Sequence, residues 1–99
     1  MSRVRHAVLF RWKPGVTPEH VAAAEQALRE LPSKVPSIRS YLFGRNLGIN
    51  PGTYDYAVIA EFDDREGYLE YRDHPDHQAF IAAYTADYVA ERAAIQMEV

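Results

Sequence analysis

The sequence predicts a single α+β domain in which the elements follow the order β-α-β-β-α-β. Two observations predict it: several segments alternate apolar and polar residues with period two, and other segments place apolar residues at helical spacing. A chain of 99 residues suits one domain, which we expect to cover residues 1–99. This order is that of the ferredoxin-like fold, a four-stranded antiparallel sheet with its helices on one face.

The first strand and the first helix are predicted over residues 3–13 and 18–31. The strand is predicted from strict alternation, with valine, histidine and aromatic residues on one side. Thr17 before Pro18 is a favourable N-cap followed by a favourable first helical residue. The apolar stripe of this helix comprises Val21, Ala24, Ala27, Leu28 and Leu31.

Two further strands are predicted over residues 38–47 and 54–62. Pro32 marks the beginning of the loop that precedes them, and the turn-forming residues 48–52 separate them. The second of these strands alternates clearly, with Tyr, Val, Ala and Phe on one face.

A second helical region follows and is broken at Pro75. Residues 63–66 resemble a capping box, so a helix is expected to run from there to about Asp73. Pro75 cannot continue a helix but can begin one, and the next helix is expected to run to about Val89. A short final strand is predicted over residues 93–99.

Large apolar side chains occur on both faces of the predicted strands, although one layer of helices can cover only one face. The uncovered face would otherwise be an unusually large exposed apolar patch. A second copy of the sheet is its natural cover, so we expect a homodimer that forms through the sheet face. The apolar residues assigned to this face are Leu9, Tyr41, Phe43, Ile59, and Ile95 or Met97.

Composition excludes several classes of protein. The net charge of −3 is unlike that of nucleic-acid-binding proteins, which usually show a basic face, so we expect no nucleic-acid partner. No apolar run is long enough for a membrane-spanning helix, and we expect no membrane association. The absence of cysteine excludes disulfides and thiol chemistry and favours a cytoplasmic location.

The segment 68–80 contains the most distinctive polar residues of the chain. The break at Pro75 places His77 in the first turn of a helix, whose partial positive charge favours the neutral imidazole that can accept a proton. Tyr71 lies just upstream and could donate a hydrogen bond to the same substrate. The alternative is that His77 bonds to the backbone and Tyr71 only packs.

Two other histidines have open roles. His6 lies between apolar residues on the core-facing side of the first strand, so it needs a hydrogen-bond partner, which could be structural or a substrate. His74 and His77 are flanked by Asp73 and Asp76, but zinc sites need three or four converging ligands. We therefore expect no metal site.

The first-strand segment Val4–Trp12 and the pattern Tyr-x-x-His-Pro-x-His at residues 71–77 together resemble the Dabb family, the stress-responsive dimeric α/β-barrel proteins. The resemblance covers nearly the whole chain. It implies a ferredoxin-like fold and a dimeric α/β barrel, in agreement with the element order and with the two apolar faces of the sheet.

The resemblance also implies a site. A plant polyketide cyclase of this family closes a ring by an aldol-type reaction without a cofactor; its catalytic His and Tyr match His77 and Tyr71, and a pocket His matches His6. A second pocket His of the cyclase is replaced by Tyr56, and small residues replace bulky ones on the first helix. The residues predicted to bind substrate are His6, Val8, Tyr56, Val58 and His74.

These observations favour a Dabb-type homodimer that binds a small, largely apolar organic molecule and needs no cofactor. If it is an enzyme, it is a cofactor-independent cyclase or lyase with His77 as base. One alternative is a stress-responsive structural or assembly protein without catalysis, whose pocket is filled by side chains. Another is a cofactor-independent monooxygenase, a chemistry known from other dimeric ferredoxin-like barrels.

Overall fold

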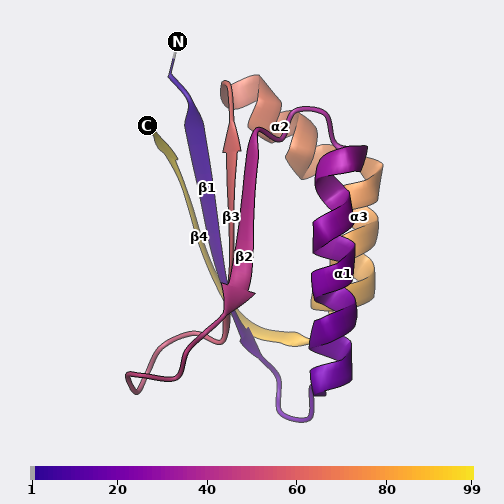
Figure 1. Cartoon of the computed structure of the whole chain (residues 1–99), viewed down its shortest axis with the longest axis vertical. Helices are drawn as coiled ribbons and strands as arrows, with labels where there is room; N and C mark the ends of the chain where they lie inside the picture. The colour runs from indigo at the N-terminus through magenta and orange to yellow at the C-terminus, as the bar shows by residue number, and fades with distance from the viewer. Residues whose placement is uncertain (1) are drawn as a thin grey trace.

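The computed structural model describes residues 2–99 and confirms the predicted ferredoxin-like fold (Figure 1). The strands are β1 (Val4–Trp12), β2 (Ser40–Arg45), β3 (Tyr56–Phe62) and β4 (Val89–Glu98). The helices are α1 (Pro18–Lys34), α2 (Arg65–Asp73), α3 (Pro75–Phe80) and the π-helical turn η1 (Ile81–Thr85). Within the described residues, no helix has both the length and the apolar character needed to cross a membrane.

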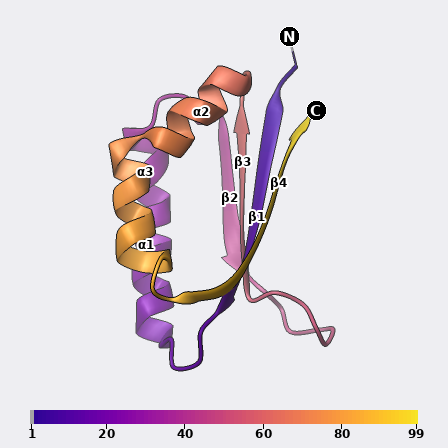
Figure 2. The ribbon, with the colours of Figure 1, turned by 180° about the vertical axis from the view of Figure 1, so that it is seen from behind.

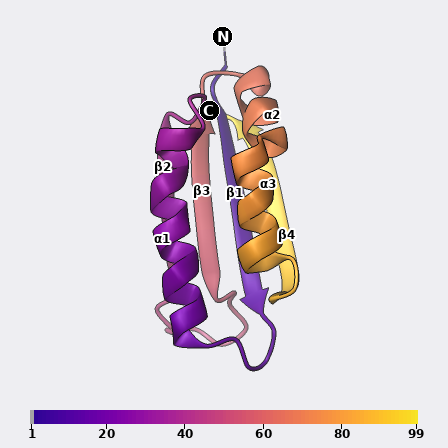
Figure 3. The same cartoon turned by 90° about the vertical axis from the view of Figure 1, so that its right-hand side faces the viewer.

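The strands form one antiparallel sheet in the order β2-β3-β1-β4, with all helices on one face, as Figures 1 and 2 show from opposite sides. In Figure 3, α1 lies over the β2 and β3 side, and α2 and α3 lie over the β1 and β4 side. The core lies between these layers. β3 contributes four buried residues in strict alternation, and Phe62 is completely buried.

α1 continues past its predicted end and includes Pro32. A proline inside a helix removes one backbone hydrogen bond. Leu31 before the proline and Val35 after it are nevertheless buried, and the N–H of Val35 donates to the carbonyl of Leu31 at 2.9 Å. Burial of these side chains offsets the cost of the proline, so the helix ends only at Lys34.

The two faces of β2 are the reverse of the predicted ones. Tyr41 pairs with Ala60 of β3, and since Ala60 points toward the helices, Tyr41 does too. Phe43 likewise packs against the core, whereas Leu42 pairs with Ile59 and is 63% exposed. The prediction was wrong because both faces of this strand carry large apolar residues, which leaves the phase of the alternation open.

The second helical region is shorter than predicted, and the last strand is longer. α3 ends at Phe80, η1 follows, and β4 begins at Val89, where a helix had been expected to end. The cause is β1, whose unpaired edge needs backbone partners along its whole length. β4 supplies them from Val89, opposite Trp12, onward, with a register shift between Arg11 and Trp12.

The outer face of the sheet carries exposed apolar side chains, as predicted, although Leu42 takes the place of the two aromatic residues of β2. They come from β1, β2 and β4, on the side opposite the helices. They are Leu9 (36% exposed), Leu42 (63%), Ile95 (58%) and Met97 (46%).

Candidate functional site

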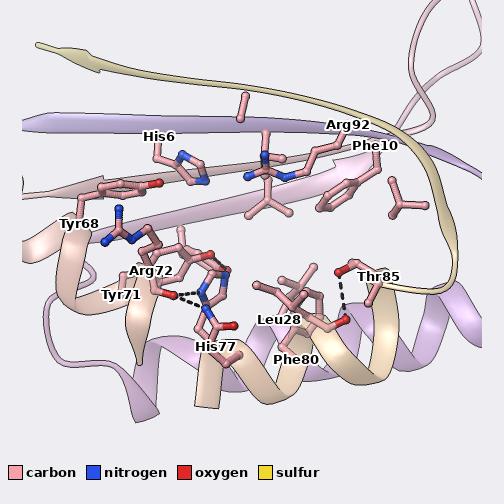
Figure 4. Close-up of a pocket in the computed structure, with 18 of the residues that line it drawn as sticks. His6, Phe10, Leu28, Tyr68, Tyr71, Arg72, His77, Phe80, Thr85 and Arg92 are labelled. Atoms are coloured by element: carbon pink, nitrogen blue, oxygen red, sulfur yellow. Dashed lines mark hydrogen bonds between the residues drawn. The ribbon is translucent and has the colours of Figure 1, made fainter. Parts of the chain in front are cut away.

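A cavity of about 750 Å³ lies between the inner face of the sheet and the helices α1, α2 and α3 (Figure 4). Its residues form two groups in the close-up, with Arg92 of β4 between them. The polar group comprises His6, Tyr68, Tyr71, Arg72 and His77. The apolar group includes Phe10, Leu28 and Phe80.

His6 enters the cavity from β1 and is held as a neutral imidazole. It is 3% exposed, and burial, together with the positive charge of Arg92, lowers its pKa from 6.5 to about 4. The side-chain amide N–H of Gln96 donates to His6 Nδ1 at 2.9 Å. Because Nδ1 accepts this bond, the remaining proton is on Nε2, which is left as a hydrogen-bond donor.

His77 is placed by the chain break that the sequence predicted. His74 adopts an extended conformation and Pro75 begins α3, so His77 turns back toward the end of α2. Its Nδ1–H donates to the carbonyl of Arg72 at 3.2 Å, which leaves Nε2 without a proton. Burial is the main cause that lowers the pKa of His77, and the bond to the Arg72 carbonyl opposes it.

Tyr71 stacks on His77, with ring centroids 4.0 Å apart, and is 3% exposed. Its hydroxyl lies 2.8 Å from the hydroxyl of Tyr41, and burial raises the pKa of Tyr71 to about 12. Burial also raises the pKa of Tyr41, so both phenols are protonated at neutral pH. A bond donated by Tyr41 leaves the Tyr71 O–H free to donate to a molecule in the cavity.

These side chains can act together in proton transfer from carbon. His77 presents an unprotonated Nε2, whereas His6 presents an Nε2–H, so one histidine can accept a hydrogen bond and the other can donate one. A base beside donors for a developing oxyanion is the arrangement that enolate chemistry requires.

The remaining predicted residues are divided between the cavity and other sites. Val8 and Val58 line the cavity. Tyr56 does not: it is buried nearby, and its hydroxyl donates to Glu25 at 3.1 Å. His74 also lies outside the cavity and serves as the N-cap of α3, where its Nδ1 accepts a backbone N–H. Among residues 2–99, no group of three or more potential metal ligands converges.

Sequence reasoning missed the contribution of β4 to the site. Gln96 lies opposite His6 and Arg92 lies opposite Phe10, so both point into the cavity with their partners. Arg92 was missed because the predicted final strand began only at residue 93, whereas Gln96 lay within that strand but its cavity-facing side was not assigned. Tyr41 was missed because its strand was assigned the wrong face.

Comparison with known proteins identifies similar sequences and folds. The family model described as Stress responsive A/B Barrel Domain, Dabb, matches residues 4–99. An uncharacterised protein of Streptomyces coelicolor is 32% identical over 83 residues, which are 82% of this chain and 86% of that protein. A dimeric ferredoxin-like protein of unknown function from Thermobifida fusca is 42% identical, with a TM-score of 0.92 over 99% of this chain and 92% of that one.

A hydroxynitrile lyase from Passiflora edulis has the same fold. The TM-score is 0.86, over 98% of this chain and 93% of that one, at 17% identity. At this identity the similarity establishes only the shared fold.

Proposed function

Since this chain belongs to the Dabb family of stress responsive A/B barrel domains, we propose that it forms a homodimer that binds a small, largely apolar organic molecule in the cavity of each subunit. The size of the cavity supports this. Ligand pockets usually enclose about 300–1,000 Å³, and the cavity here measures about 750 Å³.

The proposed reaction is a cofactor-free aldol-type ring closure. His77 Nε2 takes a proton from a carbon between two carbonyl groups, and His6 Nε2–H and the Tyr71 O–H bond to the enolate oxygen. The enolate carbon then attacks a second carbonyl carbon of the same molecule. A carbon–carbon bond forms, the carbonyl π bond breaks, and the new alkoxide takes the proton back from His77.

The observation that supports this reaction best is the pair of opposite histidine tautomers. Gln96 makes His6 a donor, and the Arg72 carbonyl makes His77 an acceptor. Both histidines have pKa values below 6.5, so both are neutral at neutral pH. A buried histidine needs a hydrogen-bond partner in any protein, so the support comes from one donor nitrogen and one acceptor nitrogen belonging to two residues that line the same cavity.

A panel of linear poly-β-ketone thioesters tests the reaction, with cyclised products measured by liquid chromatography and mass spectrometry. We expect His77→Ala to lower product formation about a hundredfold or more, since general-base catalysis contributes that much. His20→Gln is the matched control, because His20 lies outside the cavity and glutamine can still donate to the Tyr84 carbonyl that His20 contacts. Equal yields from wild type and His77→Ala would contradict catalysis and favour a binding or structural role.

The homodimer is proposed to form through the outer face of the sheet. The exposed side chains of Leu9, Leu42, Ile95 and Met97 on this face support it. Solved relatives from Thermobifida fusca and Bacteroides fragilis, 42% and 31% identical, are both described as dimeric.

Analytical ultracentrifugation at micromolar concentration tests the dimer. We expect wild type to sediment as a dimer and Leu42→Glu as a monomer, because a charge buried in an apolar interface loses its hydration. Leu69→Glu makes the same change on α2, at a leucine that is 42% exposed and lies away from the sheet, so it should remain a dimer. A monomeric wild type would contradict the proposed interface.

A further inference from the structure

The charges that line the cavity all have the same sign. The whole chain is acidic, with 14 Asp and Glu against 11 Lys and Arg. Among the described residues that line the cavity, however, none is Asp or Glu, and two are arginines, Arg72 and Arg92. Both arginines are exposed residues, so they give the cavity a positive, solvent-accessible lining that attracts anions and disfavours cations.

Only one of these two arginines is neutralised by a carboxylate. The guanidinium of Arg72 bonds Asp73 through two nitrogens, at 2.9 and 3.2 Å. The guanidinium of Arg92 makes no hydrogen bond or ion pair with another residue between positions 2 and 99. Its neighbour Glu91 lies on the opposite side of β4, where it pairs with Arg11 at 3.3 Å.

Arg92 also lies at a defined place within the cavity. It projects from β4 opposite Phe10, between the polar and the apolar groups (Figure 4). The next cavity-facing residue of β4 is Ala94, which is too small to fill the space beside the guanidinium. A bound molecule can therefore reach Arg92 and still extend to Leu28 and Phe80.

We propose that the molecule bound in this cavity is an amphipathic organic monoanion, whose carboxylate pairs with Arg92 and whose apolar part packs against Phe10, Leu28 and Phe80. This inference rests on the proposed function, which it makes more specific. Arginine binds a carboxylate through two parallel hydrogen bonds. One unpaired guanidinium balances one negative charge, which favours a carboxylate over a doubly charged phosphate monoester.

The position of Arg92 also relates this ligand to the two histidines. The positive charge of Arg92 contributes to the low pKa values of His6 and His77. A carboxylate on Arg92 neutralises that charge. Burial is the main cause of both low pKa values, and the same guanidinium that lowers them further also binds the acid group.

Isothermal titration calorimetry at about pH 8 tests the proposal with matched probes. The probes are the ω-phenylalkanoates from phenylacetate to 6-phenylhexanoate, the corresponding uncharged amides, and phenyl phosphate. We expect wild type to bind the best carboxylate about tenfold or more tighter than its amide and tighter than phenyl phosphate. In Arg92→Gln this preference should disappear while the affinity for the amide is retained. Arg65→Gln replaces an arginine that pairs with Glu98 outside the cavity, so this variant should keep the preference for carboxylates over amides.

The possible results separate the two proposals. Equal binding of acids and amides by wild type, or a preference that survives Arg92→Gln, would overturn the assignment to Arg92 but not the binding cavity. Tighter binding of phenyl phosphate than of the best carboxylate would overturn the proposal that the ligand is a monoanion. Failure of the entire series to bind at millimolar concentration would overturn the apolar ligand site and this inference together.

Discussion

The buried neutral state of His6 predicts a specific loss of stability in acid. The pKa of His6 is about 4 in the folded chain, whereas its ordinary value of 6.5 applies after unfolding. Between these values, the unfolded chain binds a proton that the folded chain does not bind. The contribution of His6 to stability is therefore complete above pH 6.5 and is lost as the pH falls toward 4.

The size of this effect follows from the two pKa values. Linkage gives a loss of about 2 kcal/mol in the free energy of unfolding at about pH 5, and about 3 kcal/mol at about pH 4. Because His6 is 3% exposed, solvent screens this effect only weakly. Such a loss is a large fraction of the stability of a small domain.

Urea unfolding at several pH values, followed by circular dichroism at one fixed protein concentration, measures the effect. The variant is His6→Gln, which removes the titrating group but keeps a polar side chain beside Gln96. Between about pH 8 and pH 5, we expect wild type to lose about 2 kcal/mol more than His6→Gln loses. His20→Gln controls for the removal of a histidine from outside the cavity.

The reasoning would be refuted if the free energy of unfolding changed with pH in the same way in wild type and in His6→Gln. That result would mean that His6 takes up its proton equally well in both states, and hence that it is not held neutral by burial. The proposed donor Nε2–H would then lose its physical basis.

Three further predictions follow from particular contacts. Phe62→Ala should lower the free energy of unfolding by about 3–5 kcal/mol, since this ring is completely buried; a loss below about 1 kcal/mol would contradict its central position. Asp64→Ala should cost about 1 kcal/mol in the same urea assay, because Asp64 caps α2, whereas the adjacent Asp63→Ala should cost less than about 0.5 kcal/mol; equal losses would exclude the cap. Tyr41→Phe should lower product formation about tenfold, because Tyr71 loses the partner that orients its hydroxyl; an unchanged rate would separate Tyr41 from the site.

The strands of which only one face is strongly apolar were predicted correctly. β3 alternates Tyr56, Val58, Ala60 and Phe62 with Ala57, Ile59 and Glu61, and the aromatic residues at both ends of the first set allowed its inner face to be identified from the sequence. β1 could be read in the same way, and His6 was placed on the inner side with its apolar neighbours. The alternation of apolar residues shows which face of a strand points toward the core, provided that the other face is clearly less apolar.

The inner face of β2 and the start of β4 were harder to predict, because the local sequence patterns there favour a different structure. β2 carries Tyr41 and Phe43 on one face and Leu42 on the other, and only its pairing with β3 distinguishes them. In the last part of the chain, Tyr84 and Tyr88 have helical spacing, yet Tyr88 lies beyond η1, where it stacks on His20 at 3.8 Å. Pairing of β4 with β1 overrides the local preference for helix. A short stretch of sequence cannot reveal this pairing, because the two strands lie far apart along the chain.

Three of the residues that were missed act on residues that were found. Tyr41 orients Tyr71, Gln96 sets the tautomer of His6, and Arg92 lowers the pKa of both histidines. Residues that act through a neighbour have no spacing rule of their own, because strand pairing rather than chain order brings them together. A motif can therefore identify candidate reacting groups, whereas their protonation states follow only from the folded chain.

β4 contributes residues both to the proposed ligand site and to the proposed dimer interface. Its side chains alternate between the cavity, which receives Arg92 and Gln96, and the outer face, which carries Ile95 and Met97. β4 is also an edge strand, held by β1 on one side only. Packing of its outer face against a second copy would restrain the same backbone that positions Gln96 against His6 and Arg92 beside the ligand. In the proposed dimer, the apolar outer face would therefore stabilise the geometry of the site as well as the association of the two copies.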